Sequence, residues 1–333
     1  MLESKFGIEI EFTGITREEA AQVAAKFLGG TLIHYGGSYD VYKIGMPDGR
    51  TWKFLSDASI NCQKKNGSGN LIEASRRYSV ECVSPVLTYY EDIEILQGLV
   101  RRLRRAGGFT NDTCGIHVHL DGGSHTPRSL WNFVNLVASR NDLFYKALQI
   151  PTERQYYCKK MDAYMVGRLN QIKPTTFDQI EQVWYENYNQ YRDLHYHSSR
   201  YHFCNLHSFF HGNHTVELRG FNSTLHAGKV RAYVVFALAM NHQALTQKRA
   251  SYRKVQSENE KFAMRVYLVR IGLSGDAFKS CRKHLYKHLD GNAAWRYGSK
   301  ENCQSHRMMK SETLNSLDEE QESEEEDTEE ESS

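Results

Sequence analysis

The amino-acid sequence predicts an α+β fold in which helices cover the apolar face of a mainly antiparallel sheet. Strand-like and helix-like segments are interspersed along the 333 residues, without the regular strand–helix–strand repeat of a parallel sheet. Several links between neighbouring strand-like segments are too short for a parallel crossover, which needs about a dozen residues. Four strand-like segments also alternate apolar and polar residues with a period of two, so each would have one apolar and one polar face.

The first part of the chain predicts a strand, a helix and several hairpins. Residues 7–12 alternate as a strand, and the capping-box sequence beginning at Thr16 predicts a helix to about Leu28. Residues 66–70 are rich in glycine and asparagine, which indicates a flexible loop. Further strands are predicted at residues 31–35, 39–44, 52–55 and 79–86, and a second helix from Thr88 to Gly107.

The remaining segments continue the mixture of strands and helices. Residues 115–120 alternate as a strand. A long amphipathic helix is predicted from Thr126 to about Leu148, and the proline after Thr126 suits its first turn. Strands are predicted at residues 200–206 and 214–219, and helices at 177–188, at 229–245 and in stretches up to about residue 289.

Composition and cysteine spacing exclude several classes of protein. Hydrophobic residues make up 40% of the chain, but no apolar run approaches the roughly 20 residues of a membrane helix. The N-terminus lacks the apolar region of a signal peptide, so a cytoplasmic protein without a membrane partner is expected. The seven cysteines include no Cys-x-x-Cys pair, which favours reduced packing residues over a disulfide framework or a zinc ribbon.

Charge divides the chain into a basic body and an acidic tail. Eleven acidic residues lie between Asp318 and Glu331, leaving residues 1–317 with 42 basic and 29 acidic side chains, a net charge of +13. We expect one domain over residues 1–300, with a helical C-terminal part from about residue 246, and a disordered tail over residues 301–333. A basic body indicates anionic ligands such as a nucleotide, a phosphorylated intermediate or a nucleic acid.

Carboxylates and histidines share one face of the predicted sheet. Glu9 lies on the same strand face as Glu11, His117 on the same face as His119, and Glu217 on the same face as Arg219. Crowded carboxylates repel one another unless a cation neutralises them, and a mostly oxygen ligand set suits Mg²⁺ or Mn²⁺ better than Zn²⁺. Arg219 could bind a phosphoryl group with two N–H donors, or could form an ion pair with Glu217. The proposed ligands are Glu9, Glu11, Glu81, Glu217 and one histidine.

The order of these motifs resembles the amidoligase branch of the glutamine synthetase and glutamate-cysteine ligase superfamily. The resemblance spans roughly residues 6–245, and the position of Glu-x-Glu ahead of Asp-x-Ser is closer to glutamate-cysteine ligase. The motifs that carry it are Glu9-x-Glu11, Asp57-x-Ser59, Glu81-x-x-Ser84-Pro85, His117-x-His119, Arg200-Tyr201 with Asn205-Leu206, and Glu217-x-Arg219-Gly220.

The resemblance implies a glutamine synthetase-like catalytic fold, whose curved antiparallel sheet binds ATP and two or three divalent ions. It implies an ADP-forming carboxylate-amine ligase that joins a carboxylate and an amine through an acyl phosphate. Asp57 would receive the proton of the amine, although Ala58 stands where many relatives have glycine. The implied metal ligands are Glu9, Glu11, Glu81, His117 and Glu217, the implied ATP-binding residues are Arg200, Asn205, Arg219 and His119, and Arg200 and Arg219 would contact phosphate.

Two other classes of function remain as alternatives. A metal-dependent hydrolase could use His117 and His119 as zinc ligands, but the glutamate that a cupin places shortly after such a pair is missing. A nonenzymatic nucleic-acid-binding protein would use the basic body and the arginine-rich run at residues 101–105. Arginines at a helix C-terminus also suit the helix dipole, and no RNA-binding signature is present, so nucleic acid is the disfavoured partner. The substrates of the ligase could be small molecules, peptides or protein side chains.

Overall fold

The computed structural model describes residues 1–309 and divides the chain into two compact units. The first unit comprises Met1–Val255 with Leu268–His288, and the second comprises Gln256–Tyr267 with the chain from Leu289 onward. Residues 300–309 are helical, whereas the eleven acidic residues from Asp318 to Glu331 lie outside the described residues. The division at residue 300 that the sequence suggests therefore stays a prediction. Within residues 1–309, no helix combines the length and the apolar character needed to cross a membrane.

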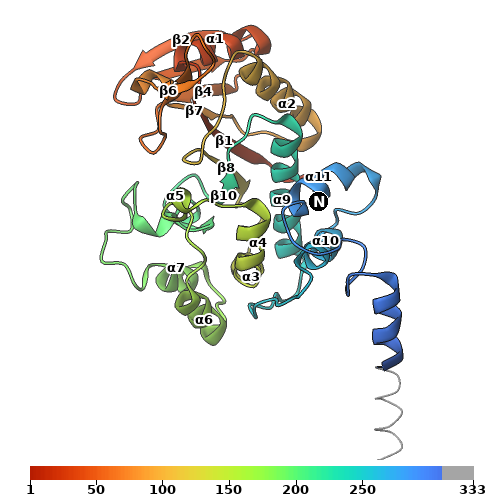
Figure 1. Ribbon diagram of the computed structural model, residues 1–333. Helices are drawn as coiled ribbons and strands as arrows, with labels where there is room; N and C mark the ends of the chain where they lie inside the picture. The colour runs from red at the N-terminus through yellow and green to blue at the C-terminus, as the bar shows by residue number, and fades with distance from the viewer. Residues whose placement is uncertain (310–333) are drawn as a thin grey trace, which may run out of the picture. The chain divides into compact units, whose positions relative to one another are not determined.

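The first unit contains an eight-stranded sheet in which every pairing is antiparallel (Figure 1). The predicted α+β class with a mainly antiparallel sheet is therefore confirmed. The strands are, in spatial order, β2 (Thr31–Gly36), β3 (Val41–Gly45), β4 (Thr51–Leu55), β7 (Val80–Val83), β1 (Phe6–Phe12), β8 (Gly115–Asp121), β10 (Thr215–Asn222) and β9 (Cys204–Asn205).

Residues 66–70, predicted as a flexible loop, form the turn of a separate hairpin. β5 (Gln63–Lys65) pairs with β6 (Leu71–Glu73), and the connecting turn is closed by the Asn66 side chain. Its Oδ1 accepts hydrogen bonds from the backbone N–H groups of Ser68 and Asn70, at 3.0 and 2.9 Å. An Asx turn of this kind gives the segment a defined hairpin conformation.

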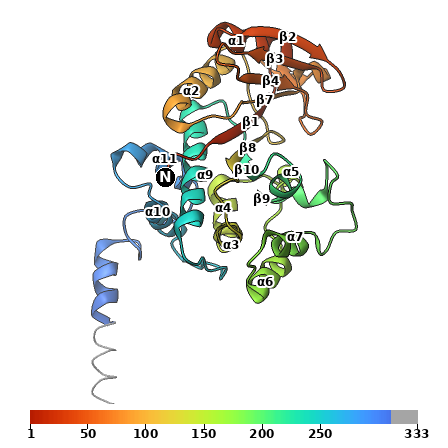
Figure 2. The ribbon, with the colours of Figure 1, turned by 180° about the vertical axis from the view of Figure 1, so that it is seen from behind.

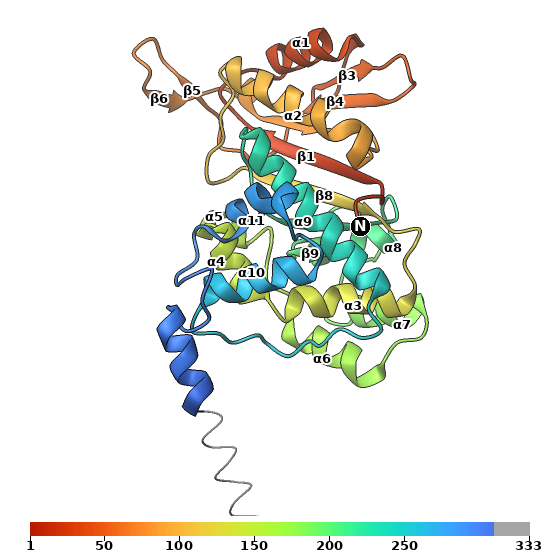
Figure 3. The same cartoon turned by 90° about the vertical axis from the view of Figure 1, so that its right-hand side faces the viewer.

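Three helices cover the apolar face of the sheet, as the alternation of the strands predicts. α1 (Arg17–Leu28) packs on β3 and β4, α9 (Ala227–Thr246) packs on β8, and α2 (Tyr89–Arg105) lies between them (Figure 3). The apolar side chains of the central strands are fully buried beneath this layer, at 1% exposure or less. They are Ile8, Ile10, Phe12, Ile116, Val118, Leu120, Val216 and Leu218.

The ends of α1 follow from local sequence. The Thr16 side chain accepts a hydrogen bond from the Glu19 N–H, and the Glu19 carboxylate accepts one from the Thr16 N–H. This reciprocal pair satisfies two of the N–H groups that a helix start leaves without partners. At the other end Gly29 has φ of 69°, which glycine adopts without steric cost.

The prediction of a single long helix up to residue 148 is wrong, because the helix is interrupted at Ser139 and Arg140. Arg140 has φ of −127° and ψ of 12°, and its N–H bonds to the carbonyl of Val137, three residues earlier. Apolar periodicity continues on both sides of the break, so the sequence pattern does not reveal it.

The other helices are α3 (Pro127–Ala138), α4 (Asn141–Leu148), α5 (Thr152–Gln155), α6 (Ala163–Ile172), α7 (Phe177–Tyr185), α8 (His207–Phe210), α10 (Glu260–Arg270) and α11 (Lys279–Tyr286), with short 3₁₀ turns η1 (Arg76–Tyr78), η2 (Ser198–Arg200) and η3 (Asp276–Phe278).

Strand β10 carries an irregularity that matters for the polar face. Its register against β8 shifts between Leu218 and Phe221, so both of these side chains are fully buried on the apolar side. Phe221 stacks on Tyr233 of α9, with ring centroids 4.6 Å apart. The residue between them that allows this close approach is Gly220, where an added Cβ would lie 2.0 Å from the ring of Phe203.

A Gly220→Ala protein is expected to lose about 1–3 kcal/mol of unfolding free energy, because Phe203 is fully buried and the new methyl overpacks the site. Urea unfolding followed by circular dichroism measures the loss. Gly167→Ala is the matched control, since no atom lies within 4 Å of its added Cβ in α6. An unchanged Gly220→Ala midpoint would mean that Phe203 moves aside without cost.

Candidate active site

The register of five antiparallel strands gathers most of the predicted site residues on one face. Across the sheet, Glu81 lies opposite Glu11, and Glu9 lies opposite His117. Glu217 of β10 lies opposite His119 on one side and Asn205 on the other. The pairings run across five neighbouring strands in the order β7, β1, β8, β10 and β9 (Figure 2).

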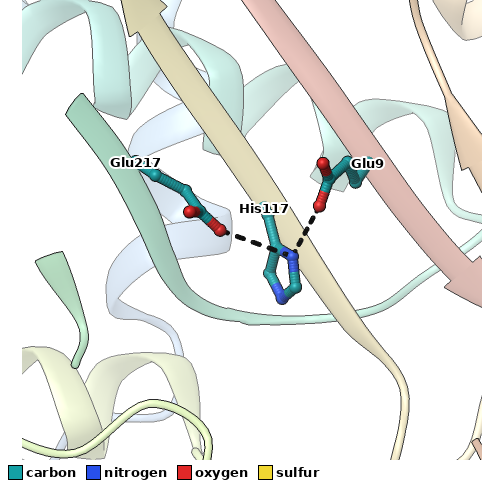
Figure 4. A group of neighbouring side chains, drawn as sticks. All are labelled: Glu9, His117 and Glu217. Atoms are coloured by element: carbon teal, nitrogen blue, oxygen red, sulfur yellow. Dashed lines mark hydrogen bonds and ion pairs between the residues drawn. The ribbon is translucent and has the colours of Figure 1, made fainter. Parts of the chain in front are cut away.

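One group of possible metal ligands consists of Glu9, His117 and Glu217 (Figure 4). The Nδ1 atom of His117 lies 2.9 Å from Glu9 Oε2 and 3.6 Å from Glu217 Oε1. His117 and Glu217 are buried, whereas the Glu9 side chain is 23% exposed. Two carboxylates and an imidazole nitrogen in this arrangement are a donor set that Mg²⁺ or Mn²⁺ accepts.

A second group consists of Glu11, Glu81 and the same His117. The other imidazole nitrogen, Nε2, lies 3.8 Å from Glu11 Oε1. Burial, together with the nearby Asp57 carboxylate, raises the pKa of Glu11 to about 8. Burial and the Glu9 and Glu11 carboxylates likewise raise the pKa of Glu81 well above its usual value. A divalent cation would relieve this repulsion and let both groups ionise, so the residues fit a metal ion.

Glu217 has a lowered pKa because positively charged groups surround it. Burial acts to raise its pKa, but the Arg219 guanidinium and the two histidines hold it at about 2. An Arg219 Nη1–H donates to Glu217 Oε1, and the Asn205 amide donates to Glu217 Oε2 at 2.6 Å. The ion pair that the sequence offered as one role for Arg219 is therefore present. Within the described residues, the Nη2 atom of Arg219 makes no hydrogen bond.

His119 belongs to neither group of possible metal ligands. Its Nε2 lies 3.1 Å from Glu9 Oε1, and its Nδ1 lies 3.3 Å from the Thr215 hydroxyl. Burial opposes its protonation, but the Glu9 and Glu217 carboxylates raise its pKa to about 9. In the part of the chain that the structure describes, no group of three potential ligands contains both His117 and His119. The paired-histidine zinc site of the hydrolase alternative therefore has no geometric support.

Asp57 lies beyond the end of β4, close enough for its charge to raise the pKa of both Glu11 and Glu81. Its Oδ1 accepts hydrogen bonds from the backbone N–H and the hydroxyl of Ser59, and its own N–H donates to the Ser79 hydroxyl. These bonds hold the carboxylate in an Asx turn that alanine at position 58 accommodates. The structure thus brings Asp57 toward the carboxylate cluster.

The structure does not bring Arg200 into contact with the carboxylates. Its Nη1 donates to the carbonyl of His195 at 3.1 Å, and its guanidinium lies 5.3 Å from the ring centroid of Tyr196. The strand predicted over residues 200–206 is wrong for most of its length, because only Cys204–Asn205 joins the sheet and His202 forms an isolated bridge with Lys159. Arg200 therefore sits in η2 rather than on the sheet, and its contact with phosphate stays a prediction.

Arg154, in α5, is a site residue that the sequence does not reveal. Its guanidinium is buried and donates to the carbonyls of Arg219 and Phe221, each at 2.8 Å, and to Asn222 Oδ1 at 3.1 Å. It therefore holds both sides of the irregularity in β10. These partners are 65 to 68 residues away in sequence, so no local spacing pattern indicates the contact.

Replacing Arg154 with methionine is expected to destabilise the protein by about 2–5 kcal/mol, since buried acceptors lose a charged donor. Methionine keeps much of the side-chain volume, so the loss reports the hydrogen bonds. Denaturant unfolding measures it, with Arg192→Met as a control at an exposed arginine whose ion pair with Glu181 is 3.4 Å long. Equal effects in the two variants would contradict a special role for Arg154.

Residues 2–241 match the protein family described as "Putative amidoligase enzyme", and the chain belongs to this family. No curated protein sequence gives a significant match. Among solved structures, the chain is similar to a bifunctional glutathione synthetase from Pasteurella multocida, with 10% identity and a TM-score of 0.34. The match covers 86% of this chain and 47% of the synthetase, so the chain spans about half the length of that protein.

Proposed function

We propose that this protein is an ATP- and Mg²⁺-dependent carboxylate-amine ligase that forms an amide bond through an acyl phosphate and releases ADP. The observation that carries the proposal is that two sets of possible metal ligands share His117 and lie beside Arg219. Membership of the amidoligase family supports formation of an amide. We also infer that the antiparallel sheet corresponds to the catalytic sheet of glutamine synthetase-like ligases.

The chemistry explains why such a site needs cations. A carboxylate is a poor acyl donor, and its attack on ATP brings two anions together. Two Mg²⁺ or Mn²⁺ ions would offset this repulsion. One would be held by Glu9, His117 and Glu217, and the other by Glu11, Glu81 and the same His117.

In the first step, an oxygen of the substrate carboxylate attacks the γ-phosphorus of ATP, and the bond between that phosphorus and the oxygen of ADP breaks. The Arg219 Nη2 group would donate to the phosphoryl oxygens while Nη1 stays bonded to Glu217. Asn205 fixes the other oxygen of Glu217, and His119 lies beside Glu9. In this proposal, Asn205 and His119 would position Glu217 and Glu9 as metal ligands next to the transferred group.

In the second step, the amine nitrogen attacks the carbonyl carbon of the acyl phosphate, and inorganic phosphate leaves. The amine must lose a proton as the bond forms. The Asp57 carboxylate, oriented by Ser59 and facing the carboxylate cluster, would accept this proton. The substrates are thus one carboxylate and one amine, whose identities depend on the loops around the polar face.

A substrate panel tests this proposal. ADP release is measured with Mg²⁺ and ATP against combined pools of amino acids, dicarboxylates, polyamines and short peptides, and mass spectrometry identifies any amide product. The proposal expects ADP release that depends on one acid and one amine together, with an equal amount of amide. Release of AMP, or hydrolysis of an amide without ATP, would refute it.

A further inference from the structure

The arginine-rich run near the end of α2 is not used by the proposed reaction, and the structure separates its members. Arg102 lies against α1, with its guanidinium 3.7 Å from the ring centroid of Phe27 and its Nη1 bonded to the carbonyl of Gly98. Arg101, Arg104 and Arg105 are exposed and line a cavity instead. Within residues 1–309, none of these three guanidinium groups has a hydrogen-bond or ion-pair partner.

The cavity has a volume of about 580 Å³ and is formed where the end of α2 meets the start of α9. Both helices belong to the layer on the apolar side of the sheet (Figure 3), so the cavity lies on the side away from the carboxylate cluster. Besides the three arginines, it is lined by Gln97, Leu225, His226, Ala227 and Gly228. Its wall contains neither an acidic residue nor an aromatic ring other than the imidazole of His226.

The first turn of α9 adds positive potential to this cavity. The turn contains no acidic residue and carries Lys229 at its third position, although the helix dipole favours a negative charge there. The His226 side chain caps the N–H of Lys229. Among the described residues, no acceptor bonds the N–H groups of Ala227 and Gly228, which are left for a ligand.

The neighbouring helix α11 contributes further cations rather than compensating carboxylates. The ring of His284 lies 5.2 Å from that of His226. Burial lowers the pKa of His284, and the nearby positive charges of His226, Lys287, Lys229 and Lys283 lower it further. Among the described residues, no carboxylate pairs with the arginines of this cavity, so a bound anion would reduce the repulsion between the positive charges.

We propose that this cavity binds a small anion carrying two or more closely spaced phosphates, at a second site separate from the carboxylate cluster. Arg101, Arg104 and Arg105 lie on one helix face, where guanidinium groups can bind several phosphate oxygens at once. The volume suits a small ligand, and the absence of a stacking surface means that the phosphates, not a base, are recognised. A free oligophosphate group fits a small concave site of this volume better than a nucleic-acid duplex does.

Isothermal titration of the full chain with tripolyphosphate tests the site, in EDTA so that no metal assists binding elsewhere. The double variant Arg101→Gln/Arg104→Gln should bind about tenfold more weakly or worse, since two charge-assisted interactions are lost. The matched control is Arg102→Gln/Lys26→Gln, which removes the same charge from exposed residues outside the cavity and should stay within about twofold of the parent.

Three results would overturn this proposal. They are no measurable binding by the parent, an equal loss of affinity in the test and control variants, and tighter binding of a 12-base-pair duplex than of tripolyphosphate at equal phosphate concentration. The last result would identify a nucleic-acid surface instead. Because the assay contains neither metal nor substrate, its outcome is independent of the ligase reaction, and Glu9→Gln should leave the affinity unchanged.

Discussion

A His117→Ala protein is expected to lose Mg²⁺-dependent ATP turnover by at least about a hundredfold, more than any single glutamate variant of the cluster. His117 is the residue that the two groups of possible ligands share, with Nδ1 facing Glu9 and Glu217 and Nε2 facing Glu11. Its removal would therefore weaken both cation positions, whereas Glu9→Gln or Glu81→Gln would remove ligand charge from one. Turnover is measured as ADP release over a range of Mg²⁺ concentrations.

Direct Mn²⁺ titration followed by electron paramagnetic resonance separates metal binding from catalysis. We expect the parent to bind two Mn²⁺ ions, Glu9→Gln and Glu81→Gln to lose tight binding of one each, and His117→Ala to lose both. Glu94→Gln, at an exposed position on α2, is the control and should bind as the parent does. If His117→Ala still bound two Mn²⁺ ions with parental affinity, the assignment of the ligands would be wrong.

An Arg219→Lys protein should turn over ATP about 10²–10³-fold more slowly while keeping its fold. Lysine keeps a positive charge beside Glu217, but it lacks the planar fork that bonds Glu217 through Nη1 while presenting Nη2 to a phosphoryl group. Steady-state ADP release gives the rate, and circular dichroism verifies the fold. Arg192→Lys, at an exposed position, serves as the control. Parental turnover by Arg219→Lys would make Arg219 only a structural partner of Glu217.

The alternation of residues along single strands was enough to predict which side chains share a face. In β1, in β8 and in β10 as far as Arg219, apolar residues buried on one side alternate with polar residues that face the opposite side, as expected for a period of two. The register between strands was not predictable in this way. Glu11 accepts a hydrogen bond from the N–H of Gly115, which is 104 residues away, and only the assembled sheet defines this pairing.

Other features of the site depend on tertiary contacts that leave no local pattern. The shift in β10 requires Gly220 against Phe203 and is held by Arg154 from a four-residue helix, too short to show periodicity. Arg200 belongs to one of the sequence motifs, but the motif does not specify the 3₁₀ turn that the chain forms around this residue. The residue spacing thus predicted which polar residues lie together on the sheet, whereas the contacts that support them became visible only in the structure.

The most direct test of the ligase proposal follows the transfer of an oxygen atom from the substrate carboxylate to inorganic phosphate. The acid of the panel that supports turnover is labelled with ¹⁸O in its carboxylate and incubated with ATP, Mg²⁺ and the amine, and the released phosphate is analysed by ³¹P nuclear magnetic resonance. Attack of the carboxylate on the γ-phosphorus, followed by amide formation, transfers one carboxylate oxygen to each phosphate. We therefore predict one ¹⁸O atom in the inorganic phosphate per amide formed. Unlabelled phosphate alongside the amide, or no acid and amine pair that supports ADP release, would contradict the account.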